Sequence, residues 1–119
     1  MNPLVDWPPE ALDYVAQYFR ALSEPTRLRI LNALGGGEKS VGEIAERVNS
    51  SIANVSRHLS QMAECGLVVR EQQGNSALYS VSDPALDELC ELVCNSIARR
   101  FDQTRSARRA FNDHLFGTR

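Results

Sequence analysis

Along most of the chain, apolar residues recur at intervals of three and four, which is the spacing of amphipathic helices. The first such segment begins at Pro8-Pro9, and its apolar face consists of Leu12, Val15, Phe19 and Leu22. A second segment follows Ser23, which can cap a helix, and it has Pro25 in its first turn. This segment is apolar over a broad face and ends at the glycines of residues 35–37, so we expect a central helix there.

Two shorter helical segments come next, separated by a turn of three residues. Ser40 and Glu43 have the spacing of a capping box, and Asn49 tolerates the left-handed backbone that a tight helix exit needs. Ser51 can cap the following helix, which ends at Gly66 and whose apolar stripe consists of Val55, Leu59 and Met62. Two short helices on either side of such a turn have the spacing of a helix-turn-helix.

After Gly66 the apolar pattern becomes typical of strands. Residues 67–70 and 77–81 are rich in β-branched and aromatic side chains, which favour strands. Residues 73–76 lie between them and supply the glycine, asparagine and serine of a tight turn. We therefore expect a β-hairpin in this region.

A long helix is predicted after the hairpin, with Asp83 as its cap and Pro84 at its first position. Its apolar face consists of Leu86, Leu89, Cys90, Val93, Cys94 and Ile97, and Phe101 can extend it. Further apolar residues indicate either a last, weaker helix or a continuation of this one: Ala107, Phe111 and Leu115.

The two short helices on either side of the turn follow other helices and precede a hairpin. This is the order of elements in a winged helix-turn-helix. The predicted fold is therefore mainly α with a small β-hairpin. We expect a flexible arm at residues 1–8, a winged helix-turn-helix domain at residues 9–101 and a basic helical extension at residues 102–119.

Length and composition are those of one globular domain. The chain has 119 residues, of which 43% are hydrophobic, and its apolar runs fall short of the roughly 18 residues that span a bilayer. The N-terminus lacks the basic and apolar regions of a secretory signal, so we expect a cytoplasmic protein without membrane contact. The three cysteines are interpreted as thiols rather than as disulfides.

Charge is distributed unevenly, although the formal net charge is only −2. Residues 83–98 hold four acids and no base, whereas residues 99–119 hold six arginines and two aspartates. A basic run of this kind is most often a solvated helix face, and otherwise it contacts nucleic acid or an acidic partner.

The helix that starts after Ser51 has an unusual exposed face, which is slim, polar and free of acid until Glu64. The major groove of DNA, about 12 Å wide, admits a helix with such a face. Arg57 suits guanine or a phosphate, Asn54 or Gln61 suits adenine, and Ser56 suits a base or a phosphate. The predicted contacts to double-stranded DNA come from this helix and from the hairpin: Ser51, Ala53, Asn54, Ser56, Arg57, His58, Gln61, Arg70 and Asn75. His58 lies near the apolar stripe, so packing is the alternative role for it.

Three stretches resemble the ArsR/SmtB family of bacterial winged-helix repressors. They are FRALSEPTRLRILNAL, EIAERVNSSIANVSRHL and ECGLVVREQQGNSALYSV, in the family's order and spacing. The resemblance covers roughly Phe19 to Ile97. It implies a homodimer that packs through its first and last helices, an operator with inverted half-sites, and release by an effector. The hairpin departs from the family pattern, because Asn75 and Ser76 stand where many relatives carry arginine.

Three effector sites known in that family are incomplete here. Ser40-Val41-Gly42 stands where a metal-binding Cys-x-Cys is frequent, and the long helix from Pro84 to Phe101 has no histidine for a zinc site. Asn32 stands where the family's persulfide sensors have a cysteine near the end of the second helix. The resemblance therefore leaves the effector open.

Cys90 and Cys94 are spaced i, i+4, so both sulfurs lie on one face of the long helix that begins at Pro84. Thiolates are soft ligands, and the predicted effector is a thiophilic metal or metalloid ion such as arsenite, antimonite or cadmium. The alternatives are reversible oxidation or persulfidation of the pair, or a role as small apolar fillers. Cys65 is interpreted as structural, and His114 as an exposed residue that can complete a site.

Other classes of function fit the sequence less well. An enzyme with a cysteine nucleophile would need a base and an anion-binding loop, and neither is recognisable. A winged helix that binds protein instead of DNA should have apolar residues on the face of residues 53–61, where this chain has polar ones. The sequence therefore predicts a DNA-binding transcriptional repressor that is not an enzyme.

Overall fold

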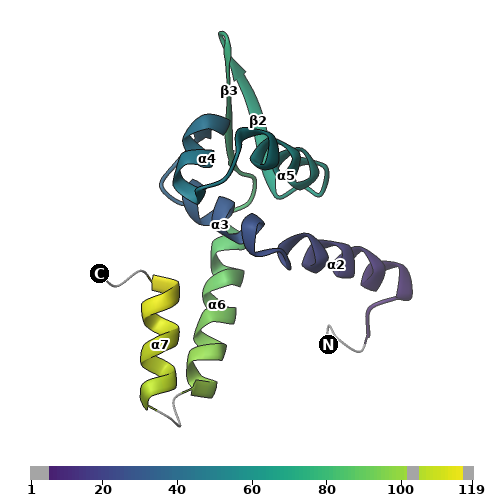
Figure 1. Cartoon of the computed structure of the whole chain (residues 1–119). Coiled ribbons are helices and arrows are strands. Elements are labelled where there is room, and N and C mark those ends of the chain that lie inside the picture. The colour runs from purple at the N-terminus through teal and green to yellow at the C-terminus, as the bar shows by residue number, and fades with distance from the viewer. Residues whose placement is uncertain (1–5, 102–104, 117–119) are drawn as a thin grey trace. The chain divides into compact units, whose positions relative to one another are not determined.

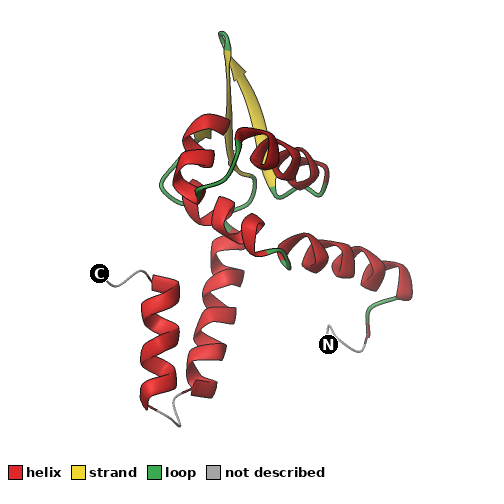
Figure 2. Ribbon diagram, in the orientation of Figure 1, coloured by secondary structure: helices red, strands yellow, loops and turns green. Residues whose placement is uncertain are grey.

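The computed structural model describes residues 6–101 and 105–116, which form two compact units divided between Asp83 and Pro84 (Figure 1). The first unit contains α2 (Pro9–Leu22), α3 (Pro25–Leu34), β1 (Lys39–Ser40), α4 (Val41–Val48), α5 (Ile52–Glu64), β2 (Val68–Gln73) and β3 (Ser76–Val81). The second contains α6 (Ala85–Arg100) and α7 (Arg105–Phe116). Figure 2 shows that helices dominate, as predicted. Each helix in the described part of the chain is too short or too polar to span a membrane.

The starts of α4 and α5 confirm the predicted helix-turn-helix. The Glu43 backbone N–H donates to the Ser40 hydroxyl, and the Ser40 N–H donates to the Glu43 carboxylate at 2.9 Å. Asn49 has the left-handed conformation with φ 57°, which turns the chain sharply. Ser51 then caps α5 by accepting the backbone N–H of Asn54 at 3.0 Å.

Two predicted helix starts are corrected by one residue each. Ser23 closes α2 instead of capping α3, because its hydroxyl donates to the Arg20 carbonyl at 2.7 Å. The cap of α3 is Glu24, whose extended backbone suits the residue that precedes a proline. Helix α6 begins at Ala85, with Pro84 rather than Asp83 at the cap position.

The predicted hairpin is confirmed, and it belongs to a three-stranded antiparallel sheet with the order β1-β3-β2. The hairpin loop is reduced to two residues, and Gly74 at its first position has φ 62°. The third strand, β1, was not predicted, because two residues are too short to show an alternating pattern. It exists through its pairing partners, with Lys39 opposite Tyr79 and Ser40 opposite Leu78.

The core of the first unit is built around α3 and α5. Helix α3 contacts α2, α4, α5 and β3, which confirms its predicted central position. The stripe predicted for α5 is fully buried. The largest fully buried side chains are Ile30, Ile44, Val55, Leu59, Met62 and Leu67. These contacts fix the orientation of α5, so its opposite face is held toward solvent.

Helix α2 leaves much of its apolar face at the surface. Leu12 and Phe19 are 41% and 52% exposed, while Ala21 near the end of the helix is buried. In the second unit, α7 is a separate helix rather than a continuation of α6. The rings of Phe101 and Phe111 lie 5.5 Å apart and join the two helices.

Candidate functional site

Helix α5 presents the slim exposed face that the sequence predicted. The exposed residues of its first three turns and cap are Ser51, Ile52, Ala53, Ser56, Arg57, Ser60 and Gln61. Asn54 is half-buried at the edge of this face. Ile52 was not predicted as a contact, because its apolar side chain offers no hydrogen bond to a base. It is 57% exposed and therefore belongs to this surface.

Asn54 is engaged at both ends of its amide group. Its Nδ2 donates to the hydroxyl of Ser50 at 3.0 Å, and its Oδ1 accepts from Nη2 of Arg57 at 2.6 Å. The side chain therefore links the turn before the helix to the guanidinium on the exposed face. Adenine would require both of these amide groups for itself.

His58 is corrected from a predicted DNA contact to a core residue. It is 3% exposed, and its Nδ1 accepts from Nε of Arg27 at 3.2 Å. The same guanidinium donates through Nη2 to Oε1 of Gln61 and through Nη1 to the Ala21 carbonyl at 3.4 Å. Arg27 therefore ties α5 to α3 and to the end of α2.

The surroundings of His58 favour the neutral form of its imidazole. Burial lowers its pKa, the charges of Arg57 and Arg27 lower it further, and the carboxylate of Glu24 acts in the opposite direction. Because Nδ1 accepts the hydrogen bond from Arg27, the ring proton is on Nε2. A second proton, on Nδ1, would place an N–H donor of His58 against the N–H donor of Arg27.

Acid should destabilise the protein through His58. Below the ordinary pKa of 6.5, the unfolded chain takes up a proton at this residue that the folded chain resists. The free energy of unfolding should therefore fall as the pH drops from about 6.5 towards 5. Urea unfolding of the wild type and of His58→Gln across this range measures the effect. The variant keeps an acceptor for Arg27 but cannot titrate, so equal pH slopes for the two proteins would contradict the prediction.

The hairpin carries its predicted contact residues at the surface. Arg70 donates to Oε1 of Gln72, and Nε2 of Gln72 donates to the Gly74 carbonyl, both at 2.9 Å. Asn75 is exposed in the loop. Glu71 follows Arg70 directly, so the hairpin offers little net positive charge to a phosphate backbone.

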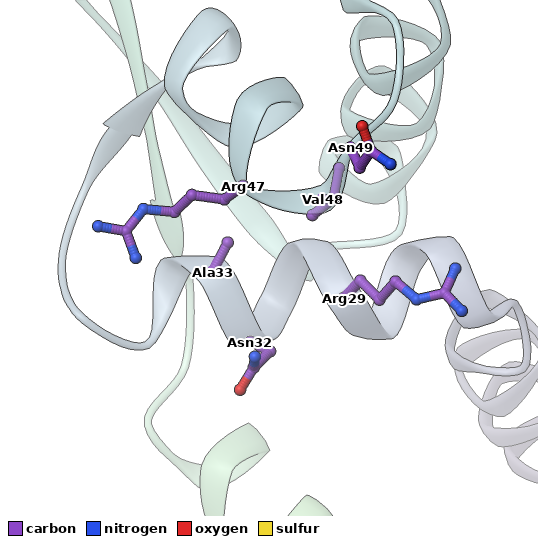
Figure 3. Close-up of a pocket in the computed structure, with 6 residues that line it drawn as sticks. All are labelled: Arg29, Asn32, Ala33, Arg47, Val48 and Asn49. Atoms are coloured by element: carbon purple, nitrogen blue, oxygen red, sulfur yellow. The ribbon is translucent and has the colours of Figure 1, made fainter. Parts of the chain in front are cut away.

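A shallow pocket of about 460 Å³ lies between α3 and α4. Its lining residues are Arg29, Asn32, Ala33, Arg47, Val48 and Asn49. Figure 3 shows the side chains of Arg29 and Arg47 pointing in opposite directions. The pocket therefore does not bring its two cations together around one anion. Both arginines are exposed, and neither was predicted as a site residue.

Cys90 and Cys94 are free thiols, partly exposed on α6. Burial raises the pKa of the Cys90 thiol, and the nearby Cys94 and Asp87 raise it further. Within the described residues, no group of three or more His, Cys, Asp or Glu side chains is arranged to hold a metal ion. One chain therefore offers two sulfur ligands on α6. Cys65 at the end of α5 and His114 on α7 are both exposed.

Comparisons with known proteins agree with the geometry of α4 and α5. The family described as "Bacterial regulatory protein, arsR family" matches residues 24–69. The transcriptional regulator CmtR of Mycobacterium tuberculosis is 41% identical over 97 residues, which cover 81% of this chain and 82% of CmtR. A probable mercury resistance operon repressor of Streptomyces lividans is 40% identical over 81 residues, covering 68% of this chain and 65% of that protein.

Solved structures include a similar fold with the same architecture. The solution structure of the homodimeric winged helix-turn-helix DNA-binding domain of Mb0332 from Mycobacterium bovis has a TM-score of 0.73 and 25% identity. The match covers 85% of this chain and 96% of that domain. The predicted winged helix-turn-helix fold is thereby confirmed.

Proposed function

Because the chain belongs to the ArsR family of bacterial regulatory proteins, we propose that it represses transcription at an operator and is released by a thiophilic effector. The observation that carries the DNA-binding part is the exposed face of α5, which is polar, slim and held in place by a buried stripe. This face would enter the major groove, with α4 crossing the backbone.

Individual side chains suit different parts of the duplex. Arg57 and Ser56 offer hydrogen bonds to base edges, and the exposed methyl groups of Ile52 and Ala53 suit the 5-methyl group of thymine. Arg29 and Arg47 lie exposed on α3 and α4 and suit phosphates, which carry no sequence information. The proposed interface therefore combines few positive charges with close contact to bases.

The protein should select a duplex with two inverted half-sites from a random pool. Their centres should lie about 34–36 Å apart, one turn of DNA, because a symmetric dimer repeats its recognition helix at that spacing. Repeated selection followed by fluorescence anisotropy at several salt concentrations measures this. The logarithm of the binding constant should fall linearly with the logarithm of the salt concentration, with a slope of about −0.9 for each phosphate contacted. Equal affinity for selected and unrelated duplexes would overturn the proposal and favour a protein-binding winged helix.

The proposed assembly is a homodimer. Exposed apolar side chains occur on α2, where Leu12 and Phe19 share one face, and on α6, where Leu92 and Val93 are 67% and 48% exposed. Apolar surface of this kind favours an interface. The homodimeric state of the Mb0332 domain supports the assembly of two copies.

The proposed effector is a thiophilic metal or metalloid ion, such as arsenite, antimonite or cadmium, bound by Cys90 and Cys94. Two thiolates do not complete the coordination shell of such an ion, but α6 from a second copy would double the number of sulfur ligands. The name of the S. lividans relative, a mercury resistance operon repressor, supports an effector of this class. Because the ligand is the thiolate, binding would release protons and weaken in acid.

Reversible oxidation or persulfidation of the same cysteines is the alternative. The partial exposure of both thiols favours it, since an oxidant or polysulfide can reach them. The raised pKa of Cys90 disfavours both alternatives, because the thiolate is the metal ligand as well as the form that reacts with oxidants. We place the metal or metalloid ion first because of the name of the S. lividans relative, a probable mercury resistance operon repressor.

A further inference from the structure

We propose that Asn54 is a positioning residue that holds the Arg57 guanidinium for contact with one guanine in each half-site. The inference rests on the proposed function, since it assigns a base to the DNA-binding face. It gives Asn54 a different role from the adenine contact that its amide group suggests in the sequence.

The contacts form a chain that starts outside the helix. The Ser50 backbone N–H donates to the Ala45 carbonyl at 3.0 Å, which fixes the turn against the end of α4. The Ser50 hydroxyl accepts from Asn54, and Asn54 accepts from Arg57. Asn54 is half-buried, whereas Arg57 is exposed, so the anchor lies in the protein and the guanidinium lies at the surface.

An anchored guanidinium suits a base better than a phosphate. Guanine presents O6 and N7 side by side in the major groove, and arginine contacts them with two N–H groups in one plane. A phosphate accepts from many directions, so a freely moving arginine serves it equally well. Asn54 occupies one of the five N–H groups of Arg57 and leaves the others available.

The neighbouring residues leave room for this contact. Ala53 lies four residues before Arg57, on the same side of α5, and its methyl group is small enough to let the helix approach the bases. The other amide on the helix, Gln61, accepts from Arg27 through Oε1. Both amides of the exposed face are therefore occupied with arginines of the protein.

Selection from random duplexes with four proteins tests the proposal. The wild type should prefer guanine at one position of each half-site, and Arg57→Ala should lose that preference with about ten- to hundredfold weaker binding. Asn54→Ala should weaken binding to the selected operator by about three- to tenfold, because Arg57 must then be ordered on binding. In the double variant, Asn54→Ala should add almost nothing to the loss caused by Arg57→Ala.

A conservative variant separates positioning from direct contact. Asn54→Asp keeps an acceptor for Arg57 but cannot donate to N7 of adenine, so it should retain the guanine preference. Replacing the selected guanine with 7-deazaguanine should weaken wild-type binding and leave Arg57→Ala unchanged. Ser50→Ala, which removes the far anchor, should act in the same direction as Asn54→Ala but more weakly. Circular dichroism confirms that each variant folds.

Three results would overturn the inference. Equal loss on operator and unrelated DNA for Arg57→Ala, with a salt slope lowered by about 1, would make Arg57 a phosphate contact. A full additional loss from Asn54→Ala in the Arg57→Ala background would make Asn54 an independent base contact. Unchanged operator affinity in Asn54→Ala would remove the positioning role. If the wild type selects no operator at all, the proposed function itself fails.

Discussion

A Cys90→Ser/Cys94→Ser variant should remain on its operator at effector concentrations that release the wild-type protein. The substitution removes both soft ligands of α6 and keeps side chains of similar size, so the free protein should bind DNA with unchanged affinity. The effector-dependent loss of affinity, about 5- to 150-fold for a typical allosteric coupling, should disappear. Fluorescence anisotropy with arsenite, antimonite, cadmium, peroxide and polysulfide measures the release.

Cys65→Ser is the matched control, because Cys65 is an exposed thiol directly after α5 rather than on α6. This variant should respond like the wild type. Release that dialysis or a chelator without reducing power reverses indicates metal or metalloid binding, whereas release that only a reductant reverses indicates oxidation. If the double variant responds to the same effector as the wild type, the cysteines of α6 are packing residues and the effector binds elsewhere.

Replacing Leu12 and Phe19 with aspartate should convert the protein to a monomer and weaken operator binding by about a hundredfold or more. Both side chains are substantially exposed on one face of α2, so charges there should prevent a second copy from packing without breaking the core. A monomer binds one half-site and loses the gain of about 10²- to 10⁴-fold that linked binding provides. Light scattering gives the mass, and anisotropy on the selected operator gives the affinity.

Tyr14→Asp provides the control for charge on α2. Tyr14 is 74% exposed, and the helical spacing places it on another side of α2 from Leu12 and Phe19. This variant should stay dimeric and bind the operator normally. A wild-type protein of monomer mass at micromolar concentration would contradict the proposed assembly before any variant is made.

The features that the sequence predicted well depend on contacts within a few residues. Ser40 reaches Glu43, Ser51 reaches the N–H of Asn54, and Asn49 adopts its own left-handed conformation. The buried stripe of α5 follows from a repeat along one helix, and the winged helix-turn-helix follows from the order of elements. Each of these signals can be recognised without knowing what lies elsewhere in the fold.

The features that were missed depend on partners far away in the chain. The burial of His58 depends on Arg27, 31 residues earlier, and β1 exists because Tyr79 and Leu78 lie beside it. Asn54 has an amide suited to adenine in isolation, and its role changes because Ser50 and Arg57 occupy both ends of that amide. Residue type indicates what a side chain can bind, and tertiary structure decides which of those partners it has.

Ser40 belongs to two structures at once, since it pairs with Leu78 in the sheet and caps α4. The hairpin and the helix-turn-helix are therefore mechanically joined at one residue, without an intervening loop. A force on the hairpin would be transmitted through β3 and Ser40 to the start of α4. The hairpin and the helix-turn-helix should therefore move together as one rigid body. Adjustment to operators of different geometry should then come from rotation of this whole body, and the angle between the hairpin and α4 should change little.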